Sequence, residues 1–108
     1  MVLEHAVLTI RPGTGSQFEA ALARARHLLA RSPGCVSVAL HRGVEDPDRY
    51  VLLVGWETVE AHTEGFRQSE AFPEWRALIG PYFAGDPVVE HLAAVDLAAV
   101  EDAAGRAG

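Results

Sequence analysis

The sequence predicts a single α+β domain of the ferredoxin-like class, with strands and helices in the order β-α-β-β-α-β. Three observations predict this class. The chain has 108 residues, near the usual size of one domain. Four short runs of aliphatic and β-branched residues flank two segments whose apolar residues recur at helical spacing. Turn signals rich in Gly and Pro separate most of these segments.

The N-terminal part of the chain is predicted to form a strand and then a helix. Residues 2–11 are rich in aliphatic and β-branched residues and end at the Pro-Gly pair 12–13, which predicts a strand and a turn. Ser16 and Glu19 have the spacing of a capping box, so we expect a helix to begin there and to end at 32–34. The apolar face of this helix comprises Phe18, Ala21, Leu22, Ala25, Leu28 and Leu29.

The remaining elements are predicted in the same way. Residues 35–42 and 49–57 read as two strands, and the polar turn between them predicts a hairpin. Thr58 is the expected N-cap of a second helix, and a further helical turn set begins near Pro73. A last strand follows at about 87–95. We therefore expect the folded domain to span residues 1–95 and an Ala-rich acidic tail to span 96–108.

Both faces of the predicted strands are apolar, which bears on assembly. A strand with one solvated face should alternate apolar and polar residues. Within 50–56, one parity holds Tyr50, Leu52, Val54 and Trp56, and the other holds Val51, Leu53 and Gly55. Two helices cannot cover both faces of a sheet, and a large exposed apolar patch is rare on a monomer. The sequence therefore predicts a homodimer in which a second sheet covers the open face.

Composition and charge exclude several function classes. The chain carries 9 basic and 15 acidic residues, for a formal net charge of -6, and it has no basic run. Such a surface repels phosphate backbones, so we expect no nucleic-acid partner. Residues 1–5 lack the basic region of a signal peptide, and no apolar stretch approaches the ~20 residues that a membrane span needs. We expect a cytoplasmic protein without a membrane partner.

Two stretches carry a resemblance to a known family. Residues 50–62 read Tyr-Val-Leu-Leu-Val-Gly-Trp-Glu-Thr-Val-Glu-Ala-His, an apolar strand that ends in Trp-Glu-Thr and leads into a helix with Glu-Ala. Residues 66–72 then contain a Ser-x-x-Phe stretch. Together with the opening strand, turn and helix, this pattern resembles the antibiotic biosynthesis monooxygenase family over about residues 3–95. The resemblance implies a dimeric α+β barrel with a small-molecule pocket between the sheet and the helices of each chain.

The resemblance also implies a range of activities. Similar proteins include cofactor-independent oxygenases of polyketide quinones, haem-degrading oxygenases and isomerases. With the Ser-x-x-Phe stretch in register, Phe66 stands where the haem-degrading branch has a Trp and Arg76 where it has its His ligand. Its first-strand Asn falls at Ala6 or His5. All three positions depart from the haem-degrading pattern, so we expect no haem and no other cofactor.

Three polar side chains are candidates for catalysis. If a helix starts after Thr58, His62 lies near the end of the third strand, where a neutral imidazole could take a proton from a phenol or enol. Arg67 could hold a substrate carboxylate or enolate oxygen. Tyr82 is the next candidate base, or part of an aromatic wall. The alternative for His62 is exposure or a hydrogen bond to a neighbouring carbonyl, and the alternative for Arg67 is a solvated helix position.

The candidate ligand-binding residues are aromatic. Phe66 and Trp75 could line an apolar pocket, and Trp56 could contribute to it or lie in the core or an interface. No metal site is expected, because the histidines are scattered without a His-x-His or a helical His pair, although strands could still bring His41 and His91 together. No phosphate-binding loop and no flavin or nicotinamide fingerprint appears either.

Two functions of different classes follow from these observations. The first is a cofactor-independent monooxygenase that acts on a small aromatic or enolisable substrate. The second is a non-catalytic dimeric protein whose pocket only binds a ligand. The polarity of the pocket discriminates between them, because a catalyst needs His62 or Arg67 to face an apolar cavity.

Overall fold

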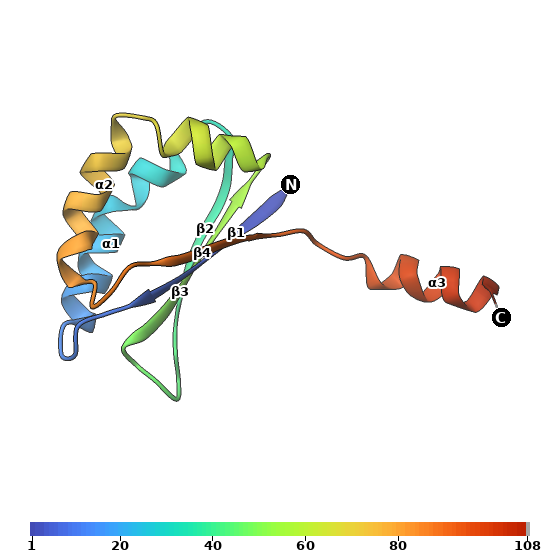
Figure 1. Cartoon of the computed structure of the whole chain (residues 1–108), viewed down its shortest axis with the longest axis horizontal. Helices are drawn as coiled ribbons and strands as arrows, with labels where there is room; N and C mark the ends of the chain where they lie inside the picture. The colour runs from blue at the N-terminus through green and yellow to red at the C-terminus, as the bar shows by residue number, and fades with distance from the viewer. Residues whose placement is uncertain (108) are drawn as a thin grey trace.

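The computed structural model describes residues 1–107, which form a four-stranded sheet with helices against one face (Figure 1). The strands lie in the order β2-β3-β1-β4, and every neighbouring pair is antiparallel. This arrangement confirms the ferredoxin-like α+β class. The elements are β1 (Val2–Thr9), α1 (Gly15–Ala30), β2 (Cys35–Arg42), β3 (Arg49–Trp56), the π-helix η1 (Ala61–Phe66), α2 (Ala71–Ile79), the 3₁₀ turn η2 (Gly80–Tyr82), β4 (Val88–Leu92) and α3 (Leu97–Ala107).

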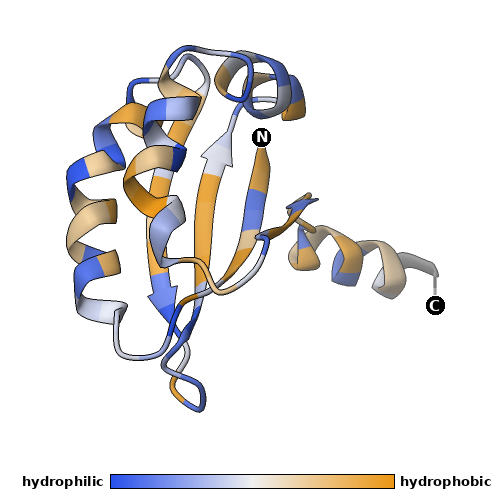
Figure 2. Ribbon diagram, turned by 60° about the vertical axis from the view of Figure 1, so that its left-hand side comes forward, coloured by the Kyte–Doolittle hydropathy of each residue, from blue (hydrophilic) through white to orange (hydrophobic). Residues whose placement is uncertain are grey.

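The core lies between the sheet and the two helices α1 and α2. Hydrophobic residues run along the central strands in Figure 2, and alternate residues of β1 and β3 are buried under the helices. One parity of β1 thus places Ala6 and Leu8 in the core. The same parity places Glu4 in that face, where it is 5% exposed. Glu4 lies at the end of the strand next to η1, opposite His91 of β4. The alternation of the strand therefore carries a carboxylate into an apolar layer.

Helix α1 begins differently from the prediction. It starts at Gly15, and the hydroxyl of Thr14 donates to the carbonyl of Arg11 at 2.7 Å instead of capping an amide. The capping box expected from Ser16 and Glu19 is absent from α1. Glu19 instead accepts hydrogen bonds from the Tyr50 hydroxyl at 2.5 Å and from Arg42 at 3.1 Å, so its carboxylate joins the helix to the sheet.

The segment after β3 forms a short helix with a π-turn. The Thr58 hydroxyl accepts a hydrogen bond from the Ala61 amide at 3.1 Å, which confirms Thr58 as the cap. The Arg67 amide donates to the His62 carbonyl at 3.0 Å, five residues back, where a regular α-helix would bond four back. The wider turn places His62 and Phe66 among the buried residues of η1. Short π-turns of this kind occur often at functional sites.

The other face of the sheet and the C-terminal segment are open. Leu3, Val7, Val51 and Leu53 are only partly buried on the sheet face that carries no helix. Strand β4 is shorter than expected, and α3 extends away from the body of the domain (Figure 1). The Asp96 carboxylate caps α3 by accepting from the Ala99 amide at 3.1 Å. Within residues 1–107, no helix combines the length and the apolar character that crossing a bilayer requires.

Candidate functional site

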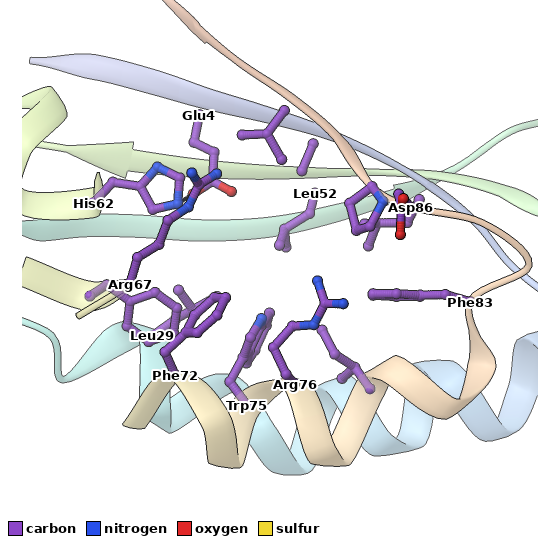
Figure 3. A pocket seen from close by; sticks show the side chains of 16 residues that line it. Glu4, Leu29, Leu52, His62, Arg67, Phe72, Trp75, Arg76, Phe83 and Asp86 are labelled. Carbon is purple, nitrogen blue, oxygen red and sulfur yellow. Dashed lines mark ion pairs between the residues drawn. The ribbon is translucent and has the colours of Figure 1, made fainter. Parts of the chain in front are cut away.

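A cavity of about 350 Å³ lies between the sheet and the helical segment that runs from η1 through α2 (Figure 3). Its floor is the helix-facing side of β1 and β3, including Ala6, Leu8 and Leu52. Its walls are largely aromatic, and its volume falls in the range of small-molecule sites. At one end the apolar lining gives way to Glu4 and His62, which makes that end the chemically distinctive part of the cavity.

The polar end is built on a buried carboxylate. The indole Nε1–H of Trp56 donates a hydrogen bond of 3.0 Å to Oε1 of Glu4. Nε2 of His62 lies 3.4 Å from the same oxygen. The imidazole of His62 also stacks on Trp56, with ring centroids 5.3 Å apart and an angle of 15° between the planes. Trp56 thus fixes both the carboxylate and the imidazole from behind the cavity wall.

His91 of β4 completes this cluster. Its Nε2 lies 2.8 Å from Nδ1 of His62, within hydrogen-bond distance. His91 is only half-buried, whereas His62 is 3% exposed. The antiparallel register places His91 directly opposite Glu4 in the sheet, so the two side chains project from the same face. Glu4, Trp56, His62 and His91 are hereafter called the polar cluster.

Burial dominates the electrostatics of the cluster. Desolvation raises the pKa of Glu4 above its usual value, although the Trp56 hydrogen bond and the nearby Arg67 charge oppose that shift. Desolvation lowers the pKa of His62 to about 4, with Arg67 and His91 acting in the same direction. His62 is therefore neutral at pH 7, and its Nε2 faces Oε1 of Glu4 at 3.4 Å without the charge that an ion pair requires.

The rest of the cavity offers two cations, the exposed carboxylate of Asp86 and a set of aromatic rings. The exposed residues Arg67 and Arg76 line it, and within residues 1–107 neither guanidinium forms an ion pair. Arg67 reaches toward Glu4 and His62, and Arg76 points into the middle of the cavity (Figure 3). The guanidinium of Arg76 lies 5.4 Å from the ring centroid of Phe83. The cavity therefore combines two positive groups and the carboxylate of Asp86 with an apolar interior.

Four of the six predicted site residues line this cavity: His62, Arg67, Phe66 and Trp75. Phe66 packs edge-to-face against Trp75, with centroids 6.2 Å apart. His62 is neither exposed nor bonded to a neighbouring carbonyl, which were the alternatives considered for it. Trp56 is fully buried behind the cavity and acts on it through Glu4 and His62.

Tyr82 lies outside the cavity lining. The 3₁₀ turn η2 directs its ring toward α1, where it packs on Phe18 with centroids 6.3 Å apart. The expectation that Tyr82 could serve the site is corrected on this ground. His41 and His91 do not meet either, because β2 and β4 form opposite edges of the sheet.

Sequence reasoning missed Glu4, Arg76 and His91 as members of a functional site. For Glu4 a signal was present: it has the same parity as the apolar residues Ala6 and Leu8 in the first strand. A carboxylate at a core-facing position is uncommon unless it is paired or functional. His91 carried no such signal, because only the register between β1 and β4 brings it to Glu4.

Comparisons with known proteins agree with this architecture. The family model described as "Antibiotic biosynthesis monooxygenase" matches residues 1–78. The uncharacterized protein YczJ of Bacillus subtilis (strain 168) is 41% identical over 91 residues, which cover 84% of this chain and 96% of YczJ. The match therefore spans nearly the whole of that relative.

Solved structures show the same fold. A crystal structure of a Bordetella bronchiseptica protein assigned to the same family superposes with a TM-score of 0.86 at 48% identity, covering 88% of this chain and 97% of that one. SnoaB, a cofactor-independent oxygenase from Streptomyces nogalater, superposes with a TM-score of 0.71 at 23% identity, covering 88% of this chain and 93% of SnoaB. The chain belongs to the antibiotic biosynthesis monooxygenase family.

Proposed function

We propose that this protein is a cofactor-independent monooxygenase of a small aromatic or enolisable substrate. The observation that carries the proposal is the polar cluster at one end of an otherwise apolar cavity, where Glu4 and His62 are buried and Arg67 lies beside them. An enzyme of this kind must remove a proton from the substrate and stabilise the anion that results. The cluster offers groups for proton transfer, and Arg67 offers a positive charge.

The substrate would supply the electrons for the reaction. Loss of a proton from a carbon next to a carbonyl, or from a phenol, gives an enolate or phenolate, which can transfer electrons to dioxygen. Conversion of a CH₂ group and O₂ into C=O and H₂O is balanced, because the two C–H bonds provide the four electrons that reduce O₂. Aromatic walls such as Phe66 and Trp75 would hold the flat anion. The apolar interior would limit access of water to it.

Two further observations support the proposal. The pocket has the polarity that distinguishes a catalyst from a simple binding protein, because both His62 and Arg67 line an apolar cavity. SnoaB, which shares the fold, is described as a cofactor-independent oxygenase. A homodimer belongs to the same proposal, because the partly apolar open face of the sheet requires a cover.

Oxygen uptake tests the proposed function. Purified protein would be supplied with 1,4-dihydroxynaphthalene, 1-naphthol and 2-tetralone in air-saturated buffer that contains a metal chelator. Uptake above the uncatalysed rate, with one atom of ¹⁸O₂ in the product by mass spectrometry, is the expected result for at least one probe. Uptake that required added flavin, haem or metal would contradict the proposal. Tight binding of a probe without any uptake would instead favour the non-catalytic binding protein.

A further inference from the structure

We propose that the proton acceptor of this site is the Glu4 carboxylate, and that His62 and Trp56 are positioning residues that hold it. This inference rests on the proposed function, because it concerns the same cavity and the same class of substrate, which loses a proton from a carbon next to a carbonyl or from a phenol. It changes the role of His62, which was the first candidate for the base. Some polar atoms of the cluster are already bonded and others are free, and this difference points to the base.

Both ring nitrogens of His62 face polar atoms of the cluster. Nδ1 lies 2.8 Å from Nε2 of His91, and Nε2 lies 3.4 Å from Oε1 of Glu4. An imidazole has only two nitrogens, and a general base must present a free lone pair to the proton that it removes. The ring is also stacked on Trp56, so it cannot turn toward a ligand without losing that contact. Nδ1 of His62 is therefore occupied by His91, and Nε2 is directed at Glu4, so the geometry favours another group as the acceptor of a substrate proton.

Glu4 presents the atom that His62 lacks. Its Oε1 receives the Trp56 indole N–H at 3.0 Å and faces His62. Within residues 1–107, Oε2 has no hydrogen-bond partner, and the residue lines the cavity. Figure 3 shows the side chain descending from β1 beside His62 and Arg67. A buried carboxylate with one oxygen held and the other free toward an apolar cavity is suited to general base catalysis.

One assignment of protons satisfies every contact in the cluster. If His91 donates from Nε2 to Nδ1 of His62, the proton of the neutral His62 ring lies on Nε2, which faces Oε1 of Glu4 at 3.4 Å. Trp56 donates to the same oxygen. This chain requires an ionised Glu4 and a neutral His62, and burial lowers the pKa of His62 far enough to keep it neutral at pH 7. His91, half-buried at the sheet edge, connects the chain to solvent.

The groups around Glu4 also set its strength as a base. His62 of η1, His91 of β4 and Arg67, the residue after η1, face Glu4. Strand β3 contributes the neutral indole of Trp56, and Cys35 of β2 lies within electrostatic range. Desolvation exceeds the stabilisation from Trp56 and Arg67, so the net pKa of Glu4 is raised. A carboxylate whose pKa moves toward neutral pH accepts a proton more readily than an ordinary one.

The chemical step is a proton transfer without redox change. A C–H bond α to the carbonyl breaks, its proton bonds to Oε2 of Glu4, and the electron pair moves into the enolate, whose oxygen faces the Arg67 guanidinium. The proton later returns to solvent, and the enolate is then available to dioxygen. Because this step precedes any reaction with oxygen, it can be measured with oxygen absent.

Anaerobic deuterium exchange tests the inference separately from oxygenation. 2-Tetralone would be incubated with the protein in D₂O, and loss of its α-proton signals followed by ¹H NMR. We expect wild-type protein to accelerate exchange and Glu4→Gln to reduce the enzymatic rate by roughly 10²–10⁴-fold, because the amide keeps the bond from Trp56 but cannot take a proton. His62→Gln should reduce the enzymatic exchange rate less, by roughly tenfold. Its pH–rate profile should keep the acid limb, because that limb reports the pKa of Glu4.

A matched control and the contrary outcomes complete the test. Glu90→Gln changes a carboxylate that pairs with His5 on the open face of the sheet, 3.6 Å from it, and should leave exchange unchanged. Glu4→Asp, which retains a carboxylate, should keep more activity than Glu4→Gln. Full exchange in Glu4→Gln, loss of the acid limb in His62→Gln, or no exchange above buffer in the wild type would overturn the inference. Exchange without oxygen uptake would uphold it and refute the monooxygenase.

Discussion

Glu4 is buried in an apolar sheet face, a position that lowers the stability of the folded protein when the carboxylate is charged. Burial is the cause, and the raised pKa of Glu4 reports it: the folded state binds the proton of Glu4 more tightly than the unfolded state does. Stability from this group is therefore present below the ordinary pKa of 4.5 and is lost as the pH rises through the folded value. Such a position suits a functional group better than a structural one.

Glu4→Gln should consequently stabilise the protein at pH 7, by about 0.5–2 kcal/mol, because the amide needs no ionisation and can still accept from Trp56. The advantage should vanish below about pH 4, where Glu4 is protonated in both states. Thermal melts of the two proteins at pH 7 and pH 4 measure the difference. A variant that melted below wild type at pH 7 would show that the charged form is favoured in the folded state.

His62 has the opposite pH dependence. Its pKa falls from 6.5 to about 4 in the folded protein, so the unfolded state binds more protons between these values and stability declines as the pH falls from 6.5 toward 4. We expect this decline to be on the order of 2–3 kcal/mol. His62→Gln removes the titrating group, and its denaturant midpoint should fall less between pH 7 and pH 4. Parallel slopes in the two proteins would contradict the assignment.

Truncation of His62 should also destabilise the fold. The side chain is buried, stacked on Trp56 and bonded to His91. His62→Ala should lower the free energy of unfolding by about 1–3 kcal/mol, since it leaves a void and removes a partner of buried polar groups. Urea denaturation at pH 7 measures the change.

Haem binding provides a further prediction about single residues. Phe66, Arg76 and Ala6, which depart from the haem-degrading pattern, all line the cavity. The histidine in the lining, His62, would have to break its bond to His91 before it could coordinate iron. We therefore expect weak binding of haem or none, in a titration that is monitored by absorbance in the Soret region. A tight complex with one haem per chain that turned over with a reductant would show that the alignment with the haem-degrading branch is wrong.

Among the elements, η1 makes a close approach to the turn that precedes β2. Gly34 has φ of +86°, and a Cβ there would lie 2.7 Å from Cβ of Ala61, the first residue of η1. The carbonyl of Gly34 also accepts a hydrogen bond from the Glu57 amide at 2.8 Å. Gly13 has a similar φ of +80°, but a Cβ there meets nothing within 4 Å. The two glycines therefore share a left-handed backbone and differ in packing.

Alanine at each position separates these effects. Gly13→Ala should cost about 1 kcal/mol, from the left-handed backbone alone. Gly34→Ala should cost about 1–3 kcal/mol more, because Ala61 must move. Since η1 carries His62, we also expect Gly34→Ala to slow the exchange of 2-tetralone while Gly13→Ala does not. Equal melting temperatures of the two variants would contradict the close contact.

The domain as a whole has one covered and one open sheet face. Leu53 and Val51 of β3 lie next to Val7 and His5 of β1 on the open face. A stable dimer interface buries roughly 1,200–2,000 Å² in total, and a sheet face supplies such an area. The proposed homodimer would pair these two faces and leave each cavity on the outer, helix-covered side.

Light scattering measures the assembly directly. We expect twice the chain mass of 11.6 kDa at micromolar concentration. Leu53→Asp should shift the protein toward monomers, because a carboxylate in the paired faces would be buried without a partner. Val44→Asp, in the exposed turn before β3, is the matched control and should leave the mass unchanged. A wild-type mass of 11.6 kDa would remove the dimer.

Much of the fold could be predicted from the sequence, because its signals are local. The strand at 35–42, the cap at Thr58 and the end of the first helix before Pro33 follow from residue types and spacings within a few positions. The same local patterns placed His62 and Phe66 on one short helix. The capping box at Ser16 was wrong because Tyr50 and Arg42, far along the chain, compete for the Glu19 carboxylate.

Local patterns in the chain were thus enough for the order of the elements, the apolar parity of the strands and the resemblance to the family. They were not enough for the polar cluster, because Glu4, His62 and His91 belong to three elements that are distant in sequence. Their meeting depends on the register between β1 and β4 and on the π-turn of η1. The register pairs strands that are distant in sequence, so no short window of residues encodes it. Hydrogen bonds between distant strands set the register, whereas periodicity reports only which face of a strand a residue occupies.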